Sequence, residues 1–157
     1  MFKIPAKLSV GLSFVIALAF IIVLITGAIM LPELINILIS FLEEKGIMNQ
    51  ISNFDRGLIL TISYLMVILA FLADIFLIFL LKRVNGGKVF TAQSVSLIRG
   101  VSWCVLIIGV FFALLGYYLQ TMLIVAFAML FLGLCLRVVK NVIEEATDIK
   151  SENDLTV

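Results

Sequence analysis

The sequence is poor in the residues on which most catalytic and metal-binding chemistry depends. It contains no histidine and only two cysteines, Cys104 and Cys135. Histidine is the usual general base near neutral pH and a common metal ligand, so sites of those kinds are excluded. Two cysteines without a CxxC spacing exclude a disulfide framework and a thioredoxin-like redox motif. We therefore expect no enzymatic activity, no metal and no cofactor.

Charged residues are scarce as well. They make up 13% of the chain, against 64% hydrophobic residues and a mean hydropathy of +1.29. This leaves too little polar surface to cover a soluble globule of this length. The basic residues flank apolar stretches and form no soluble patch, so direct binding of nucleic acid is not expected. The lipid bilayer is the expected solvent of this chain.

Three long stretches have almost no charge. Leu8–Pro32 and Gly100–Leu136 contain no charged residue, and Gly57–Leu81 contains only Asp74. A bilayer core needs about 20 apolar helical residues. The third stretch would rise roughly 55 Å as one helix, so it is expected to cross twice. The sequence predicts one all-α membrane domain over 1–157, an antiparallel bundle of four transmembrane helices, with spans near 8–31, 57–81, 100–118 and 122–138.

The basic residues also predict an orientation. Nine of the eleven Lys and Arg residues lie before span one, between spans two and three, or after span four. The positive-inside rule therefore places both termini, the loop 82–99 and the tail 139–157 in the cytoplasm of a multi-pass cell-membrane protein. Trp103 at the inner end of span three and Tyr117 with Tyr118 at its outer end fit the headgroup level.

The outer segment 32–56 is expected to contain a short interfacial helix that ends at Gly46. Its apolar residues recur at helical spacing: Leu34, Ile35, Leu38, Ile39 and Leu42.

The cytoplasmic face has two recognisable parts. Thr91 fits the N-cap of a helix that runs into span three, with Phe90 and Val95 on either side of the cap. After Arg137 the fourth helix is expected to continue as an amphipathic, acidic tail that packs on the Thr91 helix or on a protein partner. Its apolar face would hold Val139, Val142, Ile143, Ala146 and Ile149. The candidate interaction residues are Phe90, Thr91, Arg99, Glu152, Asn153, Asp154, Leu155 and Thr156.

Asp74 is the one charged side chain deep in a span, roughly 12 Å above the inner end of its helix. An ionisable group at this depth is a candidate functional site. Three interpretations stay open: an ion pair or hydrogen bond with a group such as Arg99 or Arg137, a proton or ion relay, or an interfacial position.

Small residues at helical spacing predict a helix-packing surface on span three. Gly109, Ala113 and Gly116 would let another backbone approach closely. The expected partner is span four, which carries Ala126, Ala128 and Gly133. A homodimer through the same stripe is the alternative.

Two segments resemble a known family: Gly87–Val95 with the sequence GKVFTAQSV followed by Arg99, and the ending Ile149–Val157 with the sequence IKSENDLTV. They are similar to the bacterial membrane family catalogued as domain of unknown function 2975. This chain has Ser94 where asparagine is frequent and ends in Val157 rather than isoleucine. The resemblance implies four spans and no established activity. It also implies that some members are encoded beside small helix-turn-helix regulators.

Together these observations favour a non-enzymatic membrane regulator or adaptor whose loop and acidic tail bind a cytosolic partner, such as a DNA-binding regulator. Two alternatives remain: a small oligomeric transporter or channel that uses Asp74, and a self-immunity protein against a membrane-active peptide.

Overall fold

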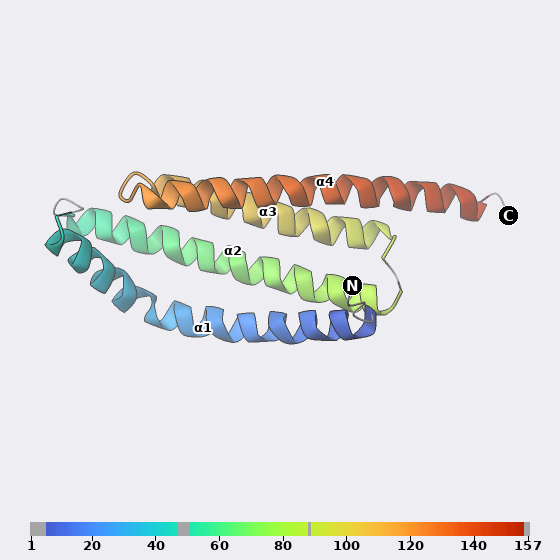
Figure 1. Ribbon diagram of the computed structural model, residues 1–157, viewed down its shortest axis with the longest axis horizontal. Coiled ribbons are helices and arrows are strands. Elements are labelled where there is room, and N and C mark those ends of the chain that lie inside the picture. Colours follow the sequence, from blue (N-terminus) through green and yellow to red (C-terminus); the bar gives the residue numbers. More distant parts are fainter. Residues whose placement is uncertain (1–5, 47–50, 88, 156–157) are drawn as a thin grey trace, which may run out of the picture.

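The computed structural model describes residues 6–46, 51–87 and 89–155, and Figure 1 shows four long helices within them. They are α1 (Ala6–Glu44), α2 (Asn53–Asn85), α3 (Ala92–Leu115) and α4 (Thr121–Leu155). Each is long and apolar enough to cross a membrane. The prediction of an all-α protein with four apolar spans is confirmed, and the stretch 100–136 does divide into two helices at a turn.

The helices lie in chain order as an antiparallel row (Figure 1). Within the described residues, close backbone contacts join α1 with α2, α2 with α3 and α3 with α4, and the last of these interfaces is the most extensive. The row therefore leaves α1 and α4 at its two edges. At one end of the row lie the N-terminus of α1, the C-terminus of α2 and the N-terminus of α3 (Figure 1). This end is called the basic end below, because Lys82, Arg83 and Arg99 lie there.

Many large apolar side chains point outward, and the buried residues include polar ones. Ile29 is 75% exposed, and Ile124 and Phe127 are each 74% exposed. Among the buried residues are three serines and one carboxylate: Ser63, Ser94, Ser102 and Asp74. In water such a surface would be strongly unfavourable, whereas lipid tails solvate it without cost.

Glycines bring α3 and α4 close together. A Cβ atom on Gly109 would lie 3.0 Å from the Leu130 side chain and 3.1 Å from its backbone nitrogen. A Cβ on Gly133 would lie 2.7 Å from the side chain of Leu106. The buried Ser102 hydroxyl donates a 2.9 Å hydrogen bond to the carbonyl of Gly133. Close packing and one interhelical hydrogen bond thus join this pair, as is usual where lipid removes the hydrophobic driving force between helices.

The remaining small residues are placed less uniformly. Gly116 follows α3 in the turn, where a Cβ would meet Leu123 at 2.4 Å, and Ala113 is half-buried. On α4, Ala126 is buried but Ala128 is exposed. Ala128 therefore lies outside the α3–α4 contact that the spacing predicts.

The expected separate interfacial helix is absent from the described chain, because its residues form the last part of α1. This helix runs through Pro32 without interruption to Glu44, and Gly46 then takes a φ of +67°, which ends it as expected. Pro32 has no N–H for the carbonyl of Ala28, four residues earlier. The Tyr64 hydroxyl of α2 donates to that carbonyl at 3.3 Å. The helix bends in Figure 1 but does not break.

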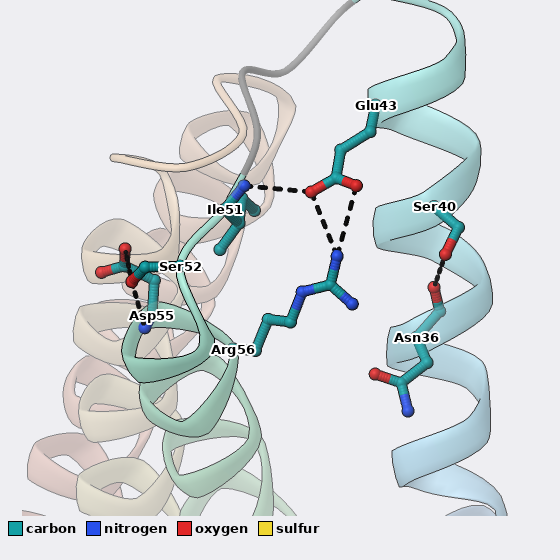
Figure 2. Close-up of polar contacts among 7 residues, drawn as sticks. All are labelled: Asn36, Ser40, Glu43, Ile51, Ser52, Asp55 and Arg56. Carbon is teal, nitrogen blue, oxygen red and sulfur yellow. Dashed lines mark hydrogen bonds and ion pairs between the residues drawn. The ribbon is translucent and has the colours of Figure 1, made fainter.

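Polar contacts fasten the ends of α1 and α2 opposite the basic end (Figure 2). The Glu43 carboxylate accepts from Arg56 Nη2 at 3.2 Å through both oxygens. It also accepts from the backbone N–H of Ile51 at 3.0 Å. One carboxylate at the end of α1 therefore orders the start of α2.

Asp55 joins the start of α2 to the turn between α3 and α4. Its carboxylate accepts from the Ser52 hydroxyl at 2.6 Å and from the Tyr118 hydroxyl at 2.9 Å. These two donors, Ser52 first, lower the pKa of Asp55 because they stabilise its charged form.

We expect Tyr64→Phe to destabilise the protein by about 1 kcal/mol, because the carbonyl that Pro32 leaves free then loses its donor. Thermal unfolding in a mild detergent measures this. Tyr117→Phe is the matched control, since the Tyr117 side chain is 88% exposed and its replacement should leave the melting temperature unchanged. Equal melting temperatures for Tyr64→Phe and the parent would contradict this role of Tyr64.

Candidate functional site

The loop at the basic end is locally well defined. Gly87, with a φ of +71°, turns the chain after α2 in a conformation that favours glycine. Thr91 is the N-cap of α3, as predicted, and its hydroxyl accepts from the N–H of Ser94 at 3.3 Å. Arg83 Nη1 of α2 donates to the same hydroxyl at 3.1 Å. Thr91 therefore couples the end of α2 to the start of α3.

Some of the other predicted interaction residues lie at the surface. Phe90 is 47% exposed, whereas Val95, predicted on the other side of the Thr91 cap, is buried. Glu152 and Asn153 are exposed on α4. Asp154 and Leu155 belong to the helical backbone of α4, and Thr156 lies outside the described residues.

Glu144 fastens the tail part of α4 to α3. Its carboxylate accepts from Arg99 Nη2 at 3.0 Å and forms an ion pair with Lys140. The hydrogen bond from Lys140 and the positive charges of Lys140 and Arg99 lower the pKa of Glu144. The tail helix is thus held against α3 by charge as well as by packing.

The apolar face predicted for the tail is divided in the structure. Ile143 and Ala146 are half-buried, but Val142 is 60% exposed and Ile149 is 56% exposed. Val139 is exposed too. The interpretation that this whole face packs on the Thr91 helix is therefore only partly right, because α3 begins at Ala92 and contacts one side of the tail.

Three acidic residues form an exposed line beside these apolar residues. Glu145, Asp148 and Glu152 are spaced by three and four positions, so they share one face of the helix. We refer to Glu145, Asp148 and Glu152 as the acidic stripe.

Asp74 lies buried within α2, only 4% exposed. Its Oδ2 atom has no hydrogen-bond partner among the described residues. Of the three interpretations of Asp74, an ion pair with Arg99 or Arg137 is not found among the described residues. Arg99 pairs with Glu144 instead, and the Arg137 guanidinium lies 4.7 Å from the centre of the Trp103 ring.

A cavity of about 480 Å³ lies beside Asp74. All four helices contribute to its wall, and apart from Asp74 and Ser13 the lining side chains are apolar: Ile16, Ala17, Phe20, Ala70, Ala73, Leu77, Leu81, Val101, Val105, Ile108 and Met129. A carboxyl group in such a space can hold a proton or face a cation. Within the described residues no group of three or more Cys, Asp or Glu side chains could hold a metal ion.

A second cavity, of about 320 Å³, includes Ser102 and Lys140, which sequence reasoning did not select, and it brings them together with residues selected for other roles. Arg137 and Lys140 of α4 line it together with Arg99, Ser102 and Trp103 of α3. The available signal was the spacing of Arg137 and Lys140, which places both on one helix face at the end of an apolar stretch. Pairing that face with Arg99 required the α3–α4 contact.

We expect Asp74→Leu to raise the stability of the protein by about 1–3 kcal/mol, because it removes a buried oxygen that lacks a hydrogen bond. Asp55→Asn is the matched contrast, since Asp55 has donors and its replacement should lower stability. Thermal unfolding in detergent compares the two. Destabilisation by Asp74→Leu would instead indicate a stabilising partner for this carboxylate.

Comparisons with known proteins agree with this architecture. Residues 5–157 match the model of a family described as protein of unknown function (DUF2975). The chain is 31% identical over 91 residues to a protein of Bacillus subtilis (strain 168) described as uncharacterized membrane protein YoaS, covering 50% of this chain and 57% of that protein. It thus spans little more than half the length of this relative, and no solved structure matches it. Because the family model covers nearly the whole sequence, the chain belongs to the DUF2975 family of membrane proteins.

Proposed function

We propose that this protein is a non-enzymatic membrane adaptor that holds a basic cytosolic partner through its tail helix. In this proposal the protein lies in the cell membrane with both termini and the basic end in the cytoplasm, as the distribution of Lys and Arg favours. The observation that carries the proposal is the continuity of α4, which runs without interruption from Thr121 to Leu155.

In this proposal the continuous helix carries the docking surface away from the membrane. Residues after position 138 add roughly 25 Å of helix beyond the expected span. Figure 1 shows that α4 extends past the ends of the other three helices. The Glu144 contacts with Arg99 and Lys140 hold the base of this extension. A partner would therefore meet a surface with a defined direction.

The chemistry of that surface selects a class of partner. The acidic stripe lies beside the exposed side chains of Val142 and Ile149. Such a face suits a basic amphipathic surface, because opposite charges steer association and the apolar side chains supply contact area. A helix-turn-helix regulator has a basic face of this kind. The acidic stripe would then compete with DNA phosphates for it.

To test the adaptor function, we would purify the tagged protein in mild detergent and identify co-purifying proteins by mass spectrometry. We expect a stoichiometric basic partner with the parent chain, and at least a tenfold loss when the stripe is neutralised by Glu145→Gln, Asp148→Asn and Glu152→Gln. Glu44→Gln, at the opposite end of the row, is the matched control and should keep the partner. Equal recovery of the same proteins with all variants would contradict the proposal.

A second candidate function is a small oligomeric transporter or channel that uses Asp74. One observation favours it: among the described residues, one oxygen of this carboxylate has no hydrogen-bond partner, and Asp74 lines a cavity to which all four helices contribute. The apolar wall of this cavity suits an apolar cation better than a hydrated ion.

Transport is tested by flux into liposomes that contain the purified protein. We expect a pH-dependent uptake of a lipophilic cation such as tetraphenylphosphonium, lost in Asp74→Asn and kept in Asp55→Asn. Uptake by the parent no faster than by empty liposomes rules this candidate out for that class of cation.

A further inference from the structure

The cavity between α3 and α4 at the basic end concentrates positive charge. Arg99, Arg137 and Lys140 line it with Ser102 and Trp103. The Ser102 hydroxyl is already committed to the Gly133 carbonyl, so the charged side chains are the main donors left for a ligand. The cavity is a different site from the acidic stripe, which lies further along α4.

The protein itself neutralises only part of this charge. Glu144 is the carboxylate paired with Arg99 and Lys140. Within the described part of the chain, Arg137 forms no ion pair, and its guanidinium lies over the Trp103 ring at 4.7 Å. Two positive charges therefore remain in excess around a space of about 320 Å³. Like charges held this close repel each other, so an anion in the cavity is favoured.

The surroundings of the cavity favour an anion that belongs to a lipid over a soluble anion. Arg99 and Arg137 bracket the uncharged stretch 100–136, so the cavity lies where the apolar part of the hairpin begins. From it an exposed apolar line runs along α3 into that part, through Trp103, Ile107 and Val110, which are 48%, 39% and 50% exposed. These residues are spaced by four and three positions and share one face. An acyl chain fits such a line, whereas a soluble anion makes no use of it.

We propose that this cavity binds the phosphate-bearing headgroup of an anionic phospholipid, with one acyl chain along the line Trp103, Ile107 and Val110. The guanidinium of Arg137 can bind two phosphate oxygens at once, and the Lys140 ammonium acts as a further point charge. In this arrangement the Trp103 ring would lie at the headgroup level, where tryptophan is favoured. Basic pockets between transmembrane helices on the cytoplasmic side are suited to such headgroups.

The test uses the full chain, purified in detergent, freed of lipid and titrated with phosphatidylglycerol while bound lipid is counted by native mass spectrometry. We expect one tightly bound lipid per chain. Phosphatidylcholine should bind at least tenfold more weakly, and Arg137→Gln with Lys140→Gln should weaken phosphatidylglycerol binding at least tenfold. Lys82→Gln is the matched control, because Lys82 is another cation of the basic end that does not line the cavity.

Arg137→Gln alone is the second variant if the double variant unfolds, because it breaks no ion pair and should still weaken binding several-fold. Inorganic phosphate separates the two sources of the anion. If millimolar phosphate displaces the lipid completely, the ligand is a free anion and the lipid assignment is wrong. Equal affinities for Arg137→Gln and Lys82→Gln, or for the two phospholipids, would also overturn the proposal.

Discussion

Lipid tails offer no hydrogen bond to a peptide group, and the main features of this structure depend on that constraint. It requires long unbroken helices, because each backbone N–H and C=O must find its partner inside the protein. The constraint is clearest at Pro32, which leaves the Ala28 carbonyl without its usual donor. The Tyr64 hydroxyl of the neighbouring helix takes that place. One side chain therefore lets α1 continue as a single helix where an aqueous protein would often end it.

The same solvent explains why small and polar residues lie at the contacts between helices. Without a hydrophobic force between helices, association depends on close packing and on hydrogen bonds. Gly109 and Gly133 bring α3 and α4 together, and Ser102 adds a hydrogen bond between them. The α3–α4 pair is consequently the most extensive contact in the row, and the cavity that holds Arg99, Arg137 and Lys140 is built on it. A closely packed pair of helices thus supports both the tail and the basic cavity.

Much of the fold could be predicted because its signals are local. Apolar length predicts the four spans, Thr91 predicts the start of α3, and Gly46 predicts the end of α1. The short interfacial helix expected after Pro32 is instead the last part of α1. Whether a helix continues through Pro32 depends on the Tyr64 hydroxyl of another helix, which local sequence does not reveal. Of the three interpretations of Asp74, an ion pair with Arg99 or Arg137 is not seen among the described residues, for a related reason. Arg99 had a nearer carboxylate in Glu144, and only the packing of α4 on α3 brings these two groups together.

The sequence by itself therefore determined the membrane class, the number of spans and the family, because these follow from composition and from spacing along one chain. The tertiary structure decided which charges meet. Among the described residues it left Asp74 Oδ2 without a hydrogen-bond partner beside an apolar cavity, and it gathered three cations from two helices around a second cavity. Such juxtapositions depend on the rotation of each helix about its axis. That rotation is set by contacts between residues far apart in the chain, such as Gly109 with Leu130, and helical periodicity alone does not specify it.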